Sequence, residues 1–361
     1  MIINCDGKIY NPLGASSYVF EKEIIPYLLD RIKKSNLKIS IGIQPNSSPH
    51  FGTLTVFVMA FELAKRLNAK NASILFEVVD TAPSETIMLD DMTYQKSLRT
   101  SGIVNIYMKQ CLEILEYLKS ETNIEYEVRF QNEFNHQKEI FPNMQKILDN
   151  KDMVAKILDP KYNNLRIRIA CPNCGLSDKN SVKNEYAGTI IISYCPIHGK
   201  FETDISRDTS KLEYNTPLRN LIRGMVYGDI NNNENISYEI MRITGSDYSG
   251  FYQEELLYKM ASALGYQVHN LPIIFYTPLI MDWSGAKLSK SLYVEKGAYS
   301  DLPKEFINFE NLKKKYNIKG LSILHDIIKK WIDNPYMLFR HYSIYYFIKE
   351  FENHEETGNL P

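Results

Sequence analysis

The sequence predicts an α/β protein whose doubly wound parallel sheet is interrupted by an insertion and followed by a short helical C-terminal segment. Residues 38–44 and 73–80 are β-branched or apolar runs of strand length, and residues 53–67 between them are apolar over a helical length. Strand, helix and strand within about 45 residues form a βαβ unit, which is typical of parallel sheets. Residues 272–281 form another apolar run, so we expect the sheet to resume late in the chain.

The chain has 361 residues, with 42 Lys and Arg against 43 Asp and Glu. This length allows two or three structural units and a sizeable core. The balanced charge excludes a histone-like attraction of the whole chain to nucleic acid. It is compatible with a local basic patch. No apolar run reaches the ~18 residues of a membrane helix and the start has no signal-peptide core, so we expect no membrane partner. The five cysteines are not spread like a disulfide framework and two of them lie in CPNCG, which favours a reducing, cytoplasmic compartment.

Further elements are expected between and after these strands. Residues 105–120 are amphipathic and predict a helix, residues 125–130 predict a strand, and residues 131–164 are polar with a helical pattern. Alternating strands then surround two cysteine-containing turns. Helical patterns resume at 216–223 and 250–264, and the chain after residue 300 is helical almost to its end.

Two short motifs, CPNCG and CPIHG, have the spacing of the two halves of a zinc ribbon. Their candidate ligands are Cys171, Cys174, Cys195 and His198. A two-residue spacing lets both side chains of a motif reach one tetrahedral ion, and the glycine after each motif suits a positive φ. Four protein ligands close such a site, so we expect a structural Zn²⁺. Two unrelated pairs of buried thiols are the alternative.

The segment after the first strand has the geometry of a phosphate site. His50 and Gly52 open the apolar helix, where backbone amides and the helix dipole favour phosphate and a glycine permits close approach. A histidine here also serves as a cap or a packed side chain. Two further candidates are the segment Gly245-Ser246-Asp247-Tyr248, whose carboxylate can accept from ribose hydroxyls, and the lysine-rich loop KLSKS at 287–291.

Together and in this order, these segments resemble motifs of the class I aminoacyl-tRNA synthetases. PHFGT resembles their HIGH motif, GSDY their ribose-binding segment and KLSKS their KMSKS loop. The particular resemblance, over roughly residues 38–295, is to the class I lysyl-tRNA synthetases, which carry a zinc-containing insertion between the halves of the sheet. The resemblance implies a Rossmann-like catalytic domain of the HUP type.

The chain departs from that family in three places. Thr53 stands where His or Asn is usual in the HIGH motif. Residues 215–219 read NTPLR, where the lysyl enzymes usually have a Trp-Pro-x-Arg-Trp stretch. About 70 residues follow the KLSKS loop, fewer than the helical anticodon-binding domain of the full-length family requires.

The resemblance implies that ATP and Mg²⁺ activate an amino acid, with lysine as the first candidate, to an aminoacyl adenylate. It implies catalytic roles for His50, Lys287 and Lys290. The residues expected to bind the nucleotide are Gly52, Thr53, Gly245, Asp247, Ser289 and Ser291. At the ends of the first two strands, Gln44 and Asp80 are candidates to meet an ammonium group, and each can equally be a strand-end hydrogen-bonding residue.

The acceptor of the activated amino acid stays open from the sequence. The acceptor end of a tRNA is one reading, and a small molecule, a peptide or a carrier protein is another, favoured by the short C-terminal segment. A non-catalytic regulatory paralogue is a third reading, against which the intact His50, Lys287 and Lys290 argue. A nucleotidyltransferase of the same superfold would not require the zinc insertion.

These assignments divide the chain into four expected segments. Residues 1–90 form the first half of the nucleotide-binding catalytic domain and residues 91–212 the connective insertion with the zinc motifs. Residues 213–298 form the second half with the KLSKS loop, and residues 299–361 form the helical C-terminal segment.

Overall fold

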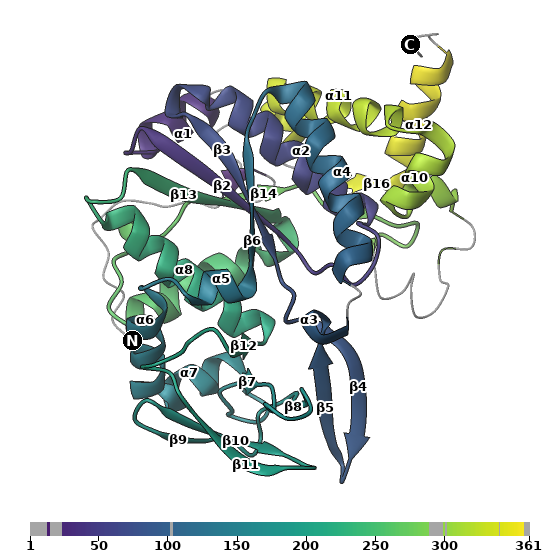
Figure 1. Cartoon of the computed structure of the whole chain (residues 1–361). Helices are drawn as coiled ribbons and strands as arrows, with labels where there is room; N and C mark the ends of the chain where they lie inside the picture. The colour runs from purple at the N-terminus through teal and green to yellow at the C-terminus, as the bar shows by residue number, and fades with distance from the viewer. Residues whose placement is uncertain are drawn as a thin grey trace.

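The computed structural model contains a central six-stranded parallel sheet with the strand order β1-β14-β13-β2-β3-β6 (Figure 1). The structure describes residues 13–14, 24–101, 104–288, 299, 302–338 and 340–356. The strands of the sheet are β1 (Leu13–Gly14), β2 (Asn36–Ile43), β3 (Ala72–Val78), β6 (Tyr126–Phe130), β13 (Tyr238–Gly245) and β14 (Ile274–Thr277). The predicted α/β class with a parallel sheet is confirmed.

Helices cover both faces of this sheet because successive strand residues alternate between two cores. On β3, Ile74 and Phe76 pack into one core, and Leu75 packs into the other. The first core is covered by α1 (Ile24–Arg31), α2 (Phe51–Arg66) and α4 (Val104–Thr122). The second is covered by α8 (Thr216–Asn232), the π-helical segment η3 (Ser249–Ala261), α5 (Gln131–Asn135), α6 (Ile140–Asp149) and α7 (Lys151–Leu158).

The strand order reverses between β2 and β13. From β2 the chain proceeds outward through β3 and β6, and it then returns to the other side of β2 as β13 and β14. In an open parallel sheet, the carboxyl ends of the strands at such a reversal form a crevice where ligands bind. The topology therefore places a binding crevice at the ends of β2 and β13.

Three small sheets form a β-rich region at the far side of the molecule from the C-terminal helices (Figure 1). They comprise β4 (Pro83–Leu89), β5 (Met92–Ser97) and β8 (Ser177–Asp178); β9 (Glu185–Ala187), β10 (Ile190–Cys195) and β11 (Gly199–Asp204); and β7 (Ile167–Ile169) with β12 (Leu212–Tyr214). The short helix α3 (Leu98–Ser101) follows β5. Within residues 91–212, the range expected for the insertion, β6 and α4 belong to the central sheet and its covering layer.

The apolar run 272–281 forms two strands instead of one. β14 ends at Thr277, and the two-residue β15 (Ile280–Met281) pairs with β16 (Tyr342–Ser343). Pro278 lies between them, and a proline has no N–H to continue a ladder. The chain is therefore redirected at the carboxyl edge of the sheet. Within the described residues, no helix combines the length and apolar character needed to span a bilayer.

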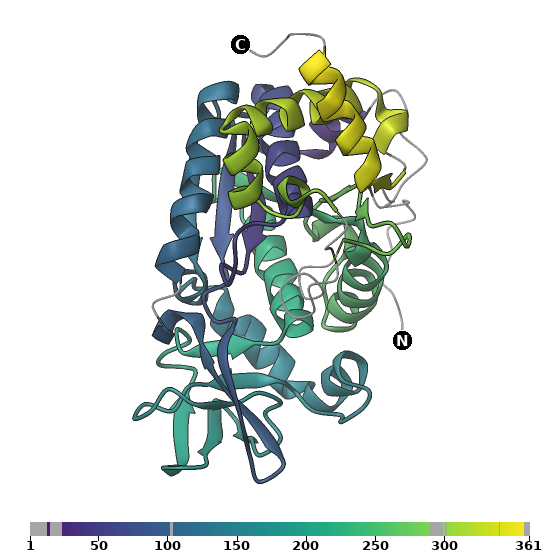
Figure 2. The same ribbon diagram turned by 90° about the vertical axis from the view of Figure 1, so that its right-hand side faces the viewer.

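The C-terminal helices and the segment before them pack against the start of α2. The turned view in Figure 2 shows these helices together at one end of the molecule. They are α10 (Phe309–Tyr316), α11 (Lys319–Asp333) and α12 (Ile344–Glu356). The Phe51 amide donates to the Ile307 carbonyl over 3.1 Å, and the Phe309 amide donates to the Pro49 carbonyl over 2.8 Å. The Phe51 ring also contacts Phe347 edge-on, with ring centroids 5.0 Å apart. The turn that precedes α2 is thus fixed from outside the sheet.

Trp331 anchors this C-terminal packing. Its ring is fully buried and stacks on Tyr342 with centroids 4.3 Å apart. We expect Trp331→Ala to lower the free energy of unfolding by about 3–5 kcal/mol, because it leaves a large cavity. The matched control is Trp283→Ala, whose ring is 62% exposed and whose loss should change stability by no more than about 0.5 kcal/mol. Denaturant unfolding followed by circular dichroism measures both, and equal losses would contradict this packing.

Candidate functional site

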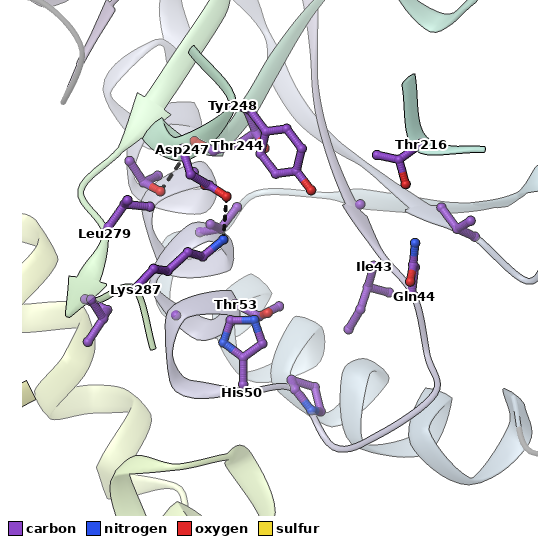
Figure 3. Close-up of a pocket in the computed structure, with 18 of the residues that line it drawn as sticks. Ile43, Gln44, His50, Thr53, Thr216, Thr244, Asp247, Tyr248, Leu279 and Lys287 are labelled. Atoms are coloured by element: carbon purple, nitrogen blue, oxygen red, sulfur yellow. Dashed lines mark hydrogen bonds and ion pairs between the residues drawn. The ribbon is translucent and has the colours of Figure 1, made fainter. Parts of the chain in front are cut away.

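A cavity of about 350 Å³ lies at the carboxyl ends of β2, β13 and β14, where the strand order reverses. Its walls come from the turn before α2, the first two turns of α8, the segment after β13 and the loop after β15. Figure 3 shows Asp247 and Lys287 together on one side, near His50 and Thr53, and Gln44 and Thr216 on the other. Segments far apart in the sequence therefore converge on one space.

His50 stands at the N-terminus of α2 in an extended conformation, with φ −74° and ψ 161°. Its carbonyl accepts the Thr53 amide over 2.8 Å, and its ring lies over Gly52. A Cβ on Gly52 would stand 3.1 Å from the Cε1 atom and 3.2 Å from the Nδ1 atom of that ring. Glycine is therefore needed for the ring to lie across the helix start. All three residues line the cavity, where the helix N-terminus favours an anion such as phosphate.

Asp247 and Lys287 form an ion pair across the cavity mouth, with Nζ and Oδ2 2.6 Å apart (Figure 3). Asp247 lies in η2 (Ser246–Tyr248), directly after β13, and folds back over Gly245. A Cβ on Gly245 would stand only 2.6 Å from the Asp247 Oδ1 atom, so this fold-back suits a glycine. The ion pair joins the segment after β13 to the loop after β15, so a ligand anion near Lys287 would compete directly with Asp247.

The other predicted residues are distributed differently. Gln44 lines the cavity at the end of β2. Asp80 does not line it: the carboxylate is 6% exposed and pairs with Arg99 over 3.3 Å. Burial raises the pKa of Asp80 against the opposing charge of Arg99. Ser289, Lys290 and Ser291 lie outside the described residues.

Four arginines, which we call the arginine cluster, lie at the inner end of the site and are absent from the sequence-based candidates. The members of the cluster are Arg129, Arg219, Arg223 and Arg242. Arg219, Arg223 and Arg242 are buried and line the cavity, whereas Arg129 is half-buried and does not line it. One carboxylate, Glu77 on β3, lies among them. Arg223 Nε is 2.7 Å from the Glu77 Oε2 atom, and Arg129 pairs with the Oε1 atom, which also accepts from the Tyr227 hydroxyl over 2.7 Å.

The charges around Glu77 decide its ionisation. Burial acts to raise the pKa of Glu77, but the charges of Arg223, Arg129 and Arg242 outweigh it and hold the pKa at about 2. Arg219, in contrast, is surrounded by charges of its own sign. Its burial and the neighbouring charges of Arg223 and Arg168 lower its pKa to about 9. The cluster therefore carries more positive charge than Glu77 balances.

The sequence carries one local signal for this cluster. Arg219 and Arg223 are four residues apart on α8 and share a helix face, and both are nearly fully buried. Arginine is seldom buried without a partner, so two on one face of a largely apolar helix indicate a polar site. Glu77 and Arg242 carry no comparable signal, because they come from separate strands.

The four predicted metal ligands meet in the β-rich region. The ligand atoms of Cys171, Cys174, Cys195 and His198 all lie within 4.8 Å of one another. Two Sγ–Nδ1 distances, from Cys171 and from Cys195 to His198, are 3.5 and 3.6 Å, and the Sγ atoms of Cys174 and Cys195 are 3.5 Å apart. Tetrahedral zinc with its usual bond lengths sets neighbouring ligand atoms roughly 3.5–3.8 Å apart, so the residues fit that ion.

Local backbone geometry produces this arrangement. The hairpin register pairs Cys195 at the end of β10 with Gly199 at the start of β11, so that Cys195 and His198 share one tight turn. Gly175 and Gly199 have φ values of 76° and 77°. The predicted positive φ after each motif is therefore confirmed. The four side chains form a cluster that could hold a metal ion, which we call the metal-binding cluster.

No protein-family model matches the chain, and no curated protein matches it significantly. Among solved structures, a Campylobacter jejuni protein assigned as an arginyl-tRNA synthetase is 10% identical with a TM-score of 0.34, and the match covers 86% of this chain and 68% of that one. Glutamyl-tRNA synthetases from Elizabethkingia meningosepticum and Elizabethkingia anophelis are each 13% identical, with TM-scores of 0.32 and 0.31. Both matches cover 74% of this chain but 54% of the other, so the chain spans about half the length of those enzymes. Likenesses this distant identify neither an activity nor a substrate.

Glu77 can be tested through the pH dependence of stability. Its pKa is about 2, against an ordinary value of 4.5, so its ionised form contributes about 3 kcal/mol above pH 4.5. A depressed pKa means that this contribution is lost as the pH falls from about 4.5 to about 2. We expect Glu77→Gln to be less stable than the parent protein by about 3 kcal/mol at pH 7, with a gap that narrows over that acidic range.

The control for this experiment is Glu127→Gln. Glu127 pairs with Lys38 over 2.7 Å but is 51% exposed, so its loss should change stability by about 1 kcal/mol or less. Denaturant midpoints between pH 2.5 and pH 7 measure both variants. A stability gap for Glu77→Gln that does not change with pH would contradict the assignment of a strongly depressed pKa.

Proposed function

We propose that the protein activates an amino acid with ATP and Mg²⁺ to form an aminoacyl adenylate and pyrophosphate, in the manner of a class I aminoacyl-tRNA synthetase. The observation that carries the proposal is the convergence of His50, Asp247 and Lys287 on one cavity at the reversal point of a parallel sheet. The order of the three motifs along the chain agrees with that family. No single motif is as specific as their meeting in space.

The reaction needs positioning and charge stabilisation more than covalent chemistry by the protein. An oxygen of the amino-acid carboxylate attacks the α-phosphorus of ATP, and the bond from that phosphorus to the oxygen bridging the β-phosphate breaks. His50 and the amides at the start of α2 would hold the phosphates, since Gly52 opens the approach to them. Asp247 would accept from the ribose hydroxyls, and Gly245 lets its carboxylate fold into place.

Lys287 would neutralise the departing pyrophosphate together with Mg²⁺. In the described structure its ammonium is held by Asp247, so nucleotide binding would exchange one anionic partner of Lys287 for another. Lys290, Ser289 and Ser291 belong to the same proposed loop by their sequence. The acceptor that we favour is the end of a tRNA, with a small molecule or a carrier as the alternative that the assay below separates.

The amino-acid specificity is the finer part of this proposal. The resemblance to lysyl enzymes favours lysine, so lysine is among the amino acids to be tested as substrates. Asp80, a candidate partner for an ammonium group, is engaged by Arg99 outside the cavity. Asp247 is the one carboxylate among the described residues that line the cavity, and it is paired with Lys287.

ATP–pyrophosphate exchange tests the activity directly. We expect exchange with one of the standard amino acids, measured with and without bulk tRNA, and a loss of about 100-fold or more in His50→Ala and Lys287→Ala. Lys200→Ala is the matched control, because Lys200 is 63% exposed in β11 and far from the cavity. Exchange that requires tRNA supports a tRNA acceptor, and exchange without it supports a smaller one. If the folded, metal-replete protein catalyses no exchange with any amino acid, with or without tRNA, the proposal is contradicted and a regulatory paralogue is favoured.

We propose that the metal-binding cluster binds a structural Zn²⁺ ion that stabilises the β-rich region. All four ligands come from the protein, so the coordination shell has no open position for a substrate. The thiols must stay reduced to bind the ion, in keeping with the expected cytoplasmic location.

Elemental analysis of the purified protein should find about one zinc ion per chain. Cys174→Ser should lose the metal and destabilise the region, because metal binding supplies folding free energy. Cys111→Ser is the control, since Cys111 is buried in α4 and belongs to the central core instead. Full zinc content in Cys174→Ser would refute the assignment of this ligand.

A further inference from the structure

The inner end of the cavity carries positive charge that no ion pair among the described residues neutralises. Arg219 and Arg242 are only 7% and 8% exposed, and both line the cavity. Arg219 donates to the Thr216 hydroxyl over 3.3 Å, and Arg242 donates to the Ser40 hydroxyl over 3.1 Å. Neither guanidinium forms an ion pair with any carboxylate in the described part of the chain. Their buried Nε atoms also have no hydrogen-bond partner there.

Glu77, a carboxylate whose charge acts on Arg242, is already engaged by other residues. Glu77 pairs with Arg129 and Arg223 and accepts from the Tyr227 hydroxyl, and the charge of Arg242 also acts on it, so three guanidiniums share this single negative charge. A nearby second pair, Arg168 with Glu213, adds no net charge. Buried cations are normally paired, so this imbalance indicates that an anion completes the group when the site is filled.

Two of the guanidiniums, those of Arg242 and Arg223, approach one point beside Gly42 that the backbone keeps open. A Cβ on Gly42 would stand 3.5 Å from the Arg242 Nη2 atom and 3.9 Å from the Arg223 Nη1 atom. Because position 42 has no side chain, this space beside β2 belongs to the cavity. Planar guanidiniums converging on one point suit a carboxylate, which accepts two parallel hydrogen bonds from each fork.

We propose that the substrate is an acidic α-amino acid whose side-chain carboxylate binds the arginine cluster. The inference rests on the proposed function and names its substrate class. The reacting carboxylate must lie beside the nucleotide, near His50 and Lys287, so the side chain is what extends toward α8 and the cluster. Beside the arginine cluster, a lysine or arginine side chain would be repelled by like charge. No carboxylate that lines this end of the described cavity would offset the resulting loss of binding free energy.

Two measurements on the full-length, metal-replete protein test this substrate class. The first is exchange with glutamate, aspartate, their amides, lysine and O-phosphoserine. We expect glutamate or aspartate to be the best substrate, at least about 100-fold better in kcat/KM than its amide or lysine, because an uncharged or cationic group leaves the buried guanidiniums unpaired. The second is equilibrium binding of the same compounds without ATP, which needs no chemistry.

A variant separates a binding role from a structural one. Arg219→Gln should raise the KM for the acidic amino acid roughly 10- to 100-fold while the KM for ATP changes little, and Arg219→Lys should restore part of the loss. The same Arg219→Gln protein should melt at an equal or higher temperature, because it removes an uncompensated buried charge. Arg207→Gln is the control, since the Arg207 side chain is 86% exposed.

The outcomes distinguish this inference from the proposed function. Exchange with lysine or an uncharged amino acid, and none with the acidic ones, would overturn the inference and leave amino-acid activation standing. Binding of glutamate or aspartate without any exchange would support the anionic pocket and contradict activation. Preference for O-phosphoserine would overturn the carboxylate assignment. A large fall in melting temperature for Arg219→Gln, with an unchanged KM in the folded fraction, would make Arg219 a structural residue.

Discussion

The site depends on one buried carboxylate. Glu77 lies on β3 beneath the cavity and joins Arg129 from β6 to Arg223 from α8. These two arginines and the nearby Arg242 of β13 would repel one another without it, in a region where water cannot screen their charges. The wall that α8 and the strands present to the cavity is therefore held by electrostatic pairing as well as by apolar packing.

This pairing leaves the cavity with two chemically different ends. At the mouth, the start of α2 and the Asp247–Lys287 pair provide a helix N-terminus, a carboxylate and an ammonium group, the set that a nucleotide requires. At the inner end, neither Arg219 nor Arg242 forms an ion pair with a carboxylate among the described residues; each donates to a hydroxyl instead. Uncompensated buried charge lowers stability, and natural proteins retain such a cost mainly where a ligand offsets it. Under the proposed function, the two ends of the cavity would bind the two parts of an adenylate.

Local patterns in the sequence predict the elements but not the whole site. The βαβ unit, in which His50 precedes the helix, and the two metal motifs can be predicted because their residues are neighbours with fixed spacing. The arginine cluster can be predicted only in part: Arg219 and Arg223 share one face of α8, but Glu77 and Arg242 are far apart along the chain and come together only through strand order. For Asp80 the local pattern is misleading. Its place at a strand end predicts a site residue, but in the structure it pairs with Arg99 and does not line the cavity. Residues 278–281 break the expected long strand, because Pro278 cannot continue the ladder.

The central claim is that this cavity binds an adenylate whose amino-acid part is acidic. Calorimetric binding of stable adenylate analogues, in which a sulfamoyl group replaces the phosphate, tests both parts at once. Such analogues bind at least about 100-fold more tightly than substrates when an enzyme forms the adenylate. The account predicts that the glutamyl or aspartyl analogue binds most tightly and the lysyl analogue at least about 100-fold more weakly. Equal or tighter binding of the lysyl analogue, or no binding of any analogue, would contradict it.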